Sequence, residues 1–420
     1  MIKKLKDVHK NKDFFNRTQD IAAVMPVVRE IITEVKNRRD VALLEYTEKF
    51  DGVKQKEKEI EVRKEEIEAA KRSVDANTLM CIEEASEAIK KFHYRQKRRA
   101  WIEKFGEGFS IGEKYVPFDV VGAYVPASYF STALMCVIPA KIAGVGEIVV
   151  CTPPGKDGNA DVRTLVAANL AGATRIFKEG GAQAIAALAF GTETIPKVQK
   201  IVGPGNVYVT AAKMLVREKG VEIDFPAGPS EILIIADETA NPSFIAADML
   251  AQAEHGEKSK AVLLTDSTMI AAEVEREILA VADEESESAS QNWILIGDDV
   301  EECIEFANEY APEHLEIMVK EPMEVLKRIK NAGSVFVGNY SPVAAGDYAT
   351  GANHVLPTAE YAKFFSGLDV DHFMRRMTIQ WLDKKGLEKI RDVVVSLSEA
   401  EGMEKHARSI EVRFSPDSSD

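Results

Sequence analysis

The chain has 420 residues, of which 45% are hydrophobic, so it can bury a large core and is expected to form two or three domains. Its formal net charge of -15 argues against binding nucleic acid or an anionic membrane through bulk electrostatics. No apolar run reaches the roughly 18 residues that span a membrane, and the N-terminus lacks the apolar core of a signal peptide. These features predict a cytoplasmic protein.

The four cysteines suggest neither a disulfide framework nor a thiolate zinc site, because none of them has CxxC spacing. They are Cys81, Cys136, Cys151 and Cys303.

Residues 1–105 are expected to form a mainly helical N-terminal segment. Apolar residues recur at helical spacing in Ile21–Val35 and Val41–Tyr46, and Asp51–Gly52 then marks a turn. Ile60 and Val62 suggest one short strand before a further helix. The residues of this segment are expected to pack against the rest of the protein rather than to take part in a reaction.

Residues 106–225 alternate between short apolar runs and helical patterns, which predicts a parallel sheet covered by helices. Ligands are expected at the carboxyl ends of its strands. The expected strands are Val120–Val125, Ile148–Cys151, Arg175–Phe177 and Ile201–Val202, and the expected helices are Ser131–Gly144, Val162–Ala171 and Ala182–Phe190.

Residues 226–360 repeat this rhythm and predict a second sheet domain of similar build. Helical patterns return in residues 361–420, which end in a polar tail. The fold class is therefore α/β, with two parallel-sheet domains between helical N-terminal and C-terminal segments. The strands expected in the second domain are Ile232–Ala236, Ala261–Thr265, Trp293–Ile296, Leu315–Val319 and Ser334–Val337.

Two glycine-bearing turns in the first sheet domain, Gly180–Gln183 and Gly203–Asn206, each open a predicted helix. Glycines there let backbone N–H groups approach an anion. Neither turn matches the dinucleotide fingerprint GxGxxG, and taken alone each is more readily explained as a plain tight turn.

Glu313 and His314 place a carboxylate beside an imidazole, directly after Pro312 and directly before a predicted strand. Proline restricts its own backbone and that of the preceding residue, so the pair is expected in a stiff loop at the strand's entrance. A neutral imidazole can take a proton from an alcohol, and the carboxylate can orient it or activate water. An isolated Glu-His pair is nevertheless more often solvated surface than an acid/base pair.

Candidate metal ligands occur in three places. Gln252 and His255 lie three residues apart, hence on one face of a predicted helix, Pro242–Gly256. Asp347 and His354 lie in a loop rich in small residues, and His406 lies near the C-terminus. Nitrogen and oxygen ligands without thiolate suit zinc or another divalent ion. A helix-capping role is the alternative for His255.

Taken together, these segments resemble histidinol dehydrogenase, an enzyme family of histidine biosynthesis, over nearly the whole chain. The segments that carry the resemblance are Tyr46–Val53, Tyr124–Pro126, Gly180–Ala187, Gly203–Asn206, Gly228–Glu231, Gln252–Gly256, Ala311–Leu315, Ala345–Tyr348, Asn353–Thr358 and Glu401–Gly402.

The resemblance implies a fold and an assembly. The family's sheets are incomplete Rossmann-like units, in agreement with the alternation above. By this resemblance residues 106–225 lie on the NAD side and residues 226–360 on the metal and catalytic side. Residues 361–420 would contribute to the site of the partner subunit in a homodimer.

The resemblance also implies roles for individual residues. It assigns one Zn²⁺ per subunit to Gln252, His255, Asp347 and His406, the last from the partner subunit. It assigns acid/base work to Glu313 and His314. Substrate contacts fall on Ser230, His354 and Glu401, besides the metal ligands and His314, and NAD contacts fall on Tyr124, Gln183 and Asn206.

The implied activity is a two-step NAD-dependent oxidation of L-histidinol through L-histidinaldehyde to L-histidine. His314 would remove the hydroxyl proton, and Glu313 would then activate the water that hydrates the aldehyde. Glu401 would meet the substrate's ammonium group. No cysteine nucleophile is needed.

One departure keeps an alternative substrate open. The loop Ala127–Phe130 is shorter by eye than the family's, so the chain could act as a related zinc and NAD dehydrogenase on another small polyol such as a sulfopropanediol. Ser230 and Glu401 favour histidinol, because a carboxylate attracts an ammonium group and repels a sulfonate. A zinc hydrolase is a remote alternative, which would leave the NAD contacts without a role.

Overall fold

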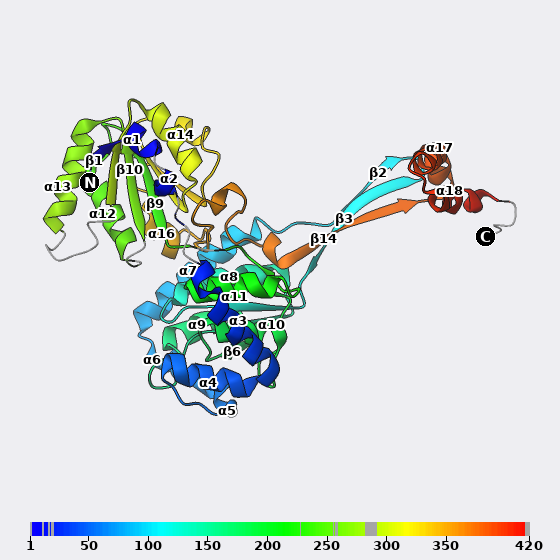
Figure 1. The fold of residues 1–420 in the computed structure, drawn as a ribbon, viewed down its shortest axis with the longest axis horizontal. Coiled ribbons are helices and arrows are strands. Elements are labelled where there is room, and N and C mark those ends of the chain that lie inside the picture. Colours follow the sequence, from blue (N-terminus) through cyan, green and yellow to red (C-terminus); the bar gives the residue numbers. More distant parts are fainter. Residues whose placement is uncertain are drawn as a thin grey trace. The chain divides into compact units, whose positions relative to one another are not determined.

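The computed structural model describes residues 2–10, 12–15, 17, 21–226, 228–254, 256, 259–281 and 292–415. The chain forms two compact units. The first comprises Met1–Lys97 and Phe118–Phe373, and the second comprises Arg98–Pro117 and Met374–Asp420. Both parallel sheets belong to the first unit (Figure 1).

The first parallel sheet has five strands in the order β6-β5-β4-β7-β8. Its central strands are short apolar runs that are buried on both faces, as is usual for parallel strands between helices. The strands are β4 (Val120–Tyr124), β5 (Glu147–Cys151), β6 (Arg175–Phe177), β7 (Lys200–Val202) and β8 (Glu222–Ile223).

Helices from two parts of the chain pack around this sheet. The crossover helices are α8 (Phe130–Ala143), α9 (Val162–Ala171), α10 (Gly181–Phe190) and α11 (Val207–Arg217). From the N-terminal part, α3 packs on α10 and α11, while α6 packs on α9 and α7 on α8. The N-terminal helices of this part are α3 (Ile21–Arg38), α4 (Asp40–Asp51), α5 (Glu57–Ile60), α6 (Lys64–Ser73) and α7 (Ala76–Tyr94). The first two helices, α1 (Leu5–His9) and α2 (Lys12–Phe15), contribute instead to the core of the second sheet.

The second parallel sheet has six strands in the order β1-β11-β10-β9-β12-β13. Its strands are β1 (Ile2–Lys4), β9 (Glu231–Ala236), β10 (Lys260–Thr265), β11 (Asn292–Ile296), β12 (His314–Met318) and β13 (Ser334–Val337). Its helices are α12 (Pro242–Ala253), α13 (Thr268–Val281), α14 (Val300–Tyr310), α15 (Pro322–Leu326) and α16 (Val343–Tyr348).

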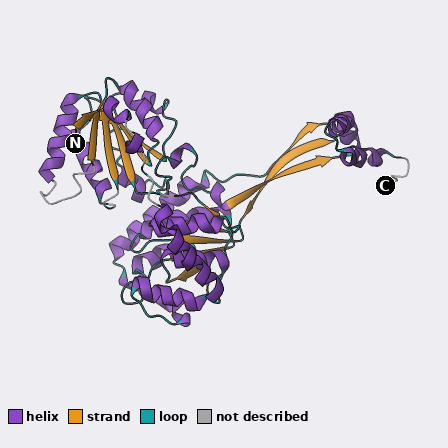
Figure 2. Ribbon diagram, viewed as in Figure 1, coloured by secondary structure: helices purple, strands orange, loops and turns teal. Residues whose placement is uncertain are grey.

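The second unit contains a three-stranded antiparallel sheet, with strand order β14-β3-β2, and two helices (Figure 2). The strands are β2 (Trp101–Gly106), β3 (Phe109–Pro117) and β14 (Met374–Leu382), and the helices are α17 (Lys384–Ala400) and α18 (Glu404–Glu411). No helix in the described part of the chain is long and apolar enough to cross a membrane.

The nine strands expected from the sequence are confirmed to within one residue at either end, and so is the α/β class with two parallel sheets. The expected strand at Ile60 and Val62 is wrong: Ile60 ends helix α5, and only Glu61 forms an isolated bridge, to Phe177.

Residues 1–105 and 361–420 were expected to be mainly helical, and no strand was predicted at Met374–Leu382 or Trp101–Gly106, which are strands. Their side chains are mostly exposed, so neither carries a strong apolar period, and pairing with β3 decides their conformation.

Candidate active site

A cavity of about 540 Å³ in the first unit brings together residues from both parallel sheets. The first sheet contributes the carboxyl ends of its strands, with Tyr124 ending β4 and Gly203 following β7. The second sheet contributes the opposite ends, because Ser230 precedes β9 and His314 begins β12. The candidate residues that line the cavity are Tyr124, Asn206, Ser230, Glu313, His314, Asp347 and His354.

The backbone around Glu313 and His314 is tightly constrained. Helix α14 ends at Tyr310; its C-cap residue Ala311 adopts a left-handed conformation with φ 51°, and Pro312 follows. A Cβ on Gly333 would lie 2.6 Å from the carbonyl oxygen of Glu313, so a neighbouring strand also packs closely here. The expected loop therefore holds Glu313, while His314 already belongs to the sheet, where it pairs with β9 and β13.

The hydrogen bonding of His314 selects the nitrogen that can act as a base. Its Nδ1 lies 3.1 Å from the carbonyl oxygen of Glu231. A carbonyl oxygen only accepts, so Nδ1 carries the proton and the lone pair of the neutral ring is on Nε2. Nε2 lies 3.9 Å from Oδ1 of Asp347, another residue of the cavity wall.

Glu313 is buried, and burial raises the pKa of its carboxyl well above the usual value. The negative charges of Glu231 and Asp347 act in the same direction, while the backbone N–H of Glu231, which donates to Oε2 of Glu313 at 2.9 Å, opposes them. A carboxyl in this environment holds its proton more tightly than one in water, as a general acid/base near neutral pH requires.

Asp347 and His354 lie together on the cavity wall. Burial raises the pKa of Asp347 to about 6. Nδ1 of His354 lies 3.0 Å from the carbonyl oxygen of Asp347, and Nε2 lies 3.3 Å from Oγ1 of Thr132. His354 thus faces the cavity with its orientation fixed by the segment that carries Asp347.

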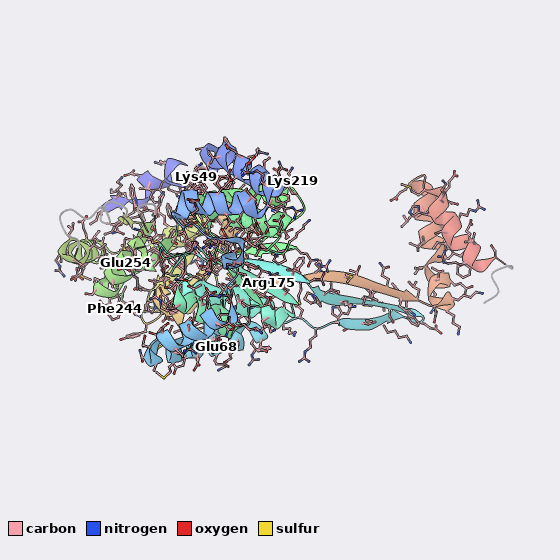
Figure 3. The ribbon with its side chains drawn as sticks, turned by 90° about the horizontal axis from the view of Figure 1, so that it is seen from below. Lys49, Glu68, Arg175, Lys219, Phe244 and Glu254 are labelled. Carbon is pink, nitrogen blue, oxygen red and sulfur yellow. The ribbon has the colours of Figure 1, made fainter. Side chains whose placement is uncertain are left out.

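Gln252, an expected metal ligand, is not among the residues that line the cavity. Gln252 lies in the last turn of α12, whose two ends are marked by Phe244 and Glu254 in Figure 3. Its side chain is buried, and its Nε2 has no hydrogen-bond partner among the described residues. A buried NH₂ group without a partner is uncommon in a folded protein, so a further group is expected to meet this amide.

The rest of the expected metal set does not assemble in the described residues. His255 lies outside the residues that the structure describes. His406, like the expected substrate contact Glu401, belongs to the second unit and is exposed. Within the described ranges no three His, Cys, Asp or Glu side chains form a metal cluster.

The three expected NAD contacts differ in their surroundings. Tyr124 lines the cavity, and its hydroxyl accepts from the backbone N–H of Gly181 at 3.2 Å. Gln183 lies in the first turn of α10, the helix that Gly181 begins; it is buried and is not among the cavity residues. Asn206 caps α11, because its Oδ1 accepts from the backbone N–H groups of Tyr208 and Val209, which leaves its NH₂ group for a ligand.

The loop Ala127–Phe130, which the sequence predicts to be short, is part of the cavity wall. Ala127, Tyr129 and Ser131 line the cavity, and Ser128 between them has a left-handed conformation with φ 66°. The loop at which the sequence departs from the family pattern therefore lies where a ligand would be in contact with it.

Several residues of the site were not anticipated from the sequence. Glu231 and Arg17 support the Glu313-His314 pair, and Lys213 and Asp224 form a buried ion pair that lines the cavity. Glu231 could have been found from the sequence, because it is a charged residue at the start of an apolar strand and belongs to the segment Gly228–Glu231. Arg17 could not have been found in this way.

The chain matches the histidinol dehydrogenase family over residues 15–414. It belongs to this family. Histidinol dehydrogenase of Methanosarcina mazei is 48% identical to it, with 99% of this chain and 98% of the relative covered. Histidinol dehydrogenase of Methanocaldococcus jannaschii is also 48% identical, with 99% of each covered.

A crystal structure of histidinol dehydrogenase from Elizabethkingia anophelis superimposes on the chain with a TM-score of 0.92 at 40% identity. The superposition covers 99% of this chain and 97% of the other. Membership in the histidinol dehydrogenase family makes the chain an oxidoreductase.

Proposed function

We propose that the chain is a zinc-dependent L-histidinol dehydrogenase that oxidises L-histidinol through L-histidinaldehyde to L-histidine with NAD. The observation that carries the proposal is the placement of His314, whose proton-accepting Nε2 lies 3.9 Å from Oδ1 of Asp347 in a cavity that Glu313 and His354 also line. Family membership supports the same substrate.

His314 takes the hydroxyl proton of the alcohol at Nε2, while the hydrogen bond of Nδ1 to Glu231 keeps the ring in the required tautomer. Ser230 and His354, from two separate segments of the cavity wall, orient the substrate. In the second half-reaction Glu313 gives up its proton to the medium and then activates the water that adds to the aldehyde.

Gln252 and Asp347, with His255, are the residues of one subunit that would hold zinc; NAD would meet Tyr124, Gln183 and Asn206. When bound, zinc positions the amino alcohol and NAD accepts the hydrides. The nitrogen and oxygen chemistry of the set fits this role, and the buried Nε2 of Gln252 has no hydrogen-bond partner among the described residues. We propose a homodimer in which His406 of the partner subunit completes the zinc set and the partner's Glu401 meets the ammonium group.

The test is NADH formation from L-histidinol by purified, zinc-loaded protein, followed to completion at limiting substrate. Two NADH per histidinol, lost on chelation and regained with zinc, is the expected result. A protein that reduces no NAD with any alcohol would contradict the proposed dehydrogenase activity and revive the hydrolase alternative.

Because the loop Ala127–Phe130 lies in the cavity wall, a sulfonated propanediol is a second candidate substrate. If the protein reduces NAD with a sulfonated propanediol and not with histidinol, the substrate assignment is wrong and the loop Ala127–Phe130 becomes the reason for the change.

A further inference from the structure

Glu231 and Glu313 hold each other through a reciprocal pair of hydrogen bonds. The backbone N–H of Glu231 donates to Oε2 of Glu313 at 2.9 Å, and the backbone N–H of Glu313 donates to Oε1 of Glu231 at 3.3 Å. The carbonyl oxygen of Glu231 accepts from Nδ1 of His314. One residue of β9 therefore contacts both members of the proposed acid/base pair.

Arg17, from the N-terminal part of the chain, completes this arrangement. Its guanidinium donates to Oε2 of Glu231 at 2.5 Å and also to the carbonyl oxygen of Tyr310. The guanidinium lies 3.5 Å from the centre of the Tyr310 ring. Since Tyr310 ends the helix just before Glu313, Arg17 and Glu231 together hold both ends of the short segment that carries the carboxyl.

Glu231 also connects this segment to another part of the cavity wall. Its Oε1 accepts from the backbone N–H of Ala359 at 3.1 Å. The neighbouring Thr358, which lines the cavity, accepts through Oγ1 from the backbone N–H of Gly228. The Glu231 carboxylate is thus a common acceptor for two segments of the wall.

The charges in this cluster explain why an arginine is required. Glu231 and Glu313 are both buried, and they repel each other whenever both are ionised, as Glu313 must be to activate water. The side chains of the Arg17–Glu231 ion pair are 2% and 3% exposed, so solvent screens the pair little. Lys260, half-buried at the start of β10, also faces Arg17 and Glu231. Asp347 and His314 face Glu313 from the cavity side.

We infer that Arg17 and Glu231 are positioning residues of the dehydrogenase reaction: they fix the Glu313 carboxyl for water activation and act through it. The inference rests on the proposed function, because it assigns a task to Glu313. A purely structural ion pair would stabilise the fold equally well, so the test must separate the two.

The experiment is a double-mutant cycle on the two half-reactions. Arg17→Gln combined with Glu231→Gln removes both charges without leaving a buried unpaired one, so this paired variant is expected to fold. NADH formation is measured separately from L-histidinaldehyde and from L-histidinol under single-turnover conditions. We expect about a tenfold or greater loss of the rate with the aldehyde, while the rate with the alcohol falls by less than about threefold.

The same pair of substitutions is then made in a Glu313→Gln background. If Arg17 and Glu231 act through the Glu313 carboxyl, they add less than about a twofold further loss there, because coupled residues are not additive. A full tenfold loss in this background, or equal losses in both half-reactions of the parent, would overturn the inference.

A matched control is Lys178→Gln, which removes another buried cation from its carboxylate, Glu66, at 2.9 Å. Lys178 does not line the cavity, and its substitution is expected to lower thermal stability without changing the ratio of the two rates. Arg17→Lys keeps the charge but loses the planar fork of the guanidinium. Its rate with the aldehyde should therefore lie between that of the paired variant and that of the parent protein. Full restoration would show that charge alone suffices and contradict positioning by the guanidinium.

Different experimental results would contradict the inference and the proposed function. If the parent protein forms no NADH from histidinol, the proposed function is wrong. If it forms two NADH per histidinol and the cycle is additive, only the role of Arg17 and Glu231 is wrong.

Discussion

At the scale of single residues, a buried carboxyl pair beside the site should make stability depend on pH. Glu316 lies two residues after His314, hence on the same face of β12, and it faces Asp248. Burial, reinforced by the charge of Asp248, raises the pKa of Glu316 to about 9. Burial also raises the pKa of Asp248 to about 6. Both groups therefore hold protons in the folded state that they release in the unfolded chain.

The sign of the pH effect follows from linkage. Between the ordinary pKa of a glutamate and pH 9 the folded state binds more protons than the unfolded state, so the free energy of unfolding falls as pH rises. Glu316→Gln is uncharged and can still accept from the backbone N–H of Val343, which Oε1 of Glu316 does at 2.9 Å. The variant should therefore be more stable than the parent at pH 8, with a difference that shrinks towards pH 5.

Denaturant unfolding of the parent and of Glu316→Gln from pH 5 to pH 8 measures this difference in the free energy of unfolding. Each proton released on unfolding changes that free energy by up to about 1.4 kcal/mol per pH unit. The exposed Glu305 supplies a matched control, since Glu305→Gln should leave the slope unchanged. A Glu316→Gln protein that is less stable than its parent at pH 8 would contradict the argument.

Only some residues of the site can be found from their neighbours in the sequence. Glu313 and His314 are noticeable as a pair, because the proline before them and the strand after them are both local features. Arg17 could not be found that way, since its partner Glu231 is 214 positions away and nothing near Arg17 indicates a buried ion pair. The tautomer of His314 likewise depends on a carbonyl oxygen of another strand.

At the scale of elements, the turn after β7 depends on a glycine. Gly203 has φ 110°, a conformation that side chains rarely adopt, and a Cβ there would lie 2.1 Å from the carbonyl oxygen of Tyr124. Gly203→Ala should therefore lower the free energy of unfolding by about 3 kcal/mol or more, from backbone strain and a backbone clash together.

Gly220 is the control for strain alone, because it has φ 87° and nothing lies within 4 Å of its Cβ position. Gly220→Ala should cost only about 1 kcal/mol. Equal losses of stability in the two variants, measured by denaturant unfolding, would show that the close approach to Tyr124 does not matter.

Elements were predictable where burial dictates the pattern. The parallel strands, such as Ile232–Ala236, are continuous apolar runs between helices, and burial on both faces requires that composition. Met374–Leu382 has a mostly exposed surface and no such requirement, and its partner strand β3 lies more than two hundred residues earlier. Its conformation is decided by that distant pairing, which no local window contains.

At the scale of the whole molecule, the proposed homodimer predicts that two inactive variants can restore each other. His314 lines the cavity of the first unit, whereas His406 is exposed in the second unit. If His406 serves the partner's site, a mixed dimer of His314→Asn and His406→Asn chains has one intact site and one site lacking both histidines. Each variant alone has no intact site.

Random association makes half of the dimers mixed, so co-refolded or co-expressed variants should regain about a quarter of the parent activity if the dimer is symmetric. NADH formation from histidinol measures this, with zinc content as a second readout, since His406→Asn alone should bind less zinc. Pairing His314→Asn with Glu313→Gln provides the control, because both residues line the same cavity and every mixed dimer then has two damaged sites. No recovery in the first mixture would place His406 in the site of its own chain or outside any site. Recovery in the control would show that the gain does not come from sharing His406.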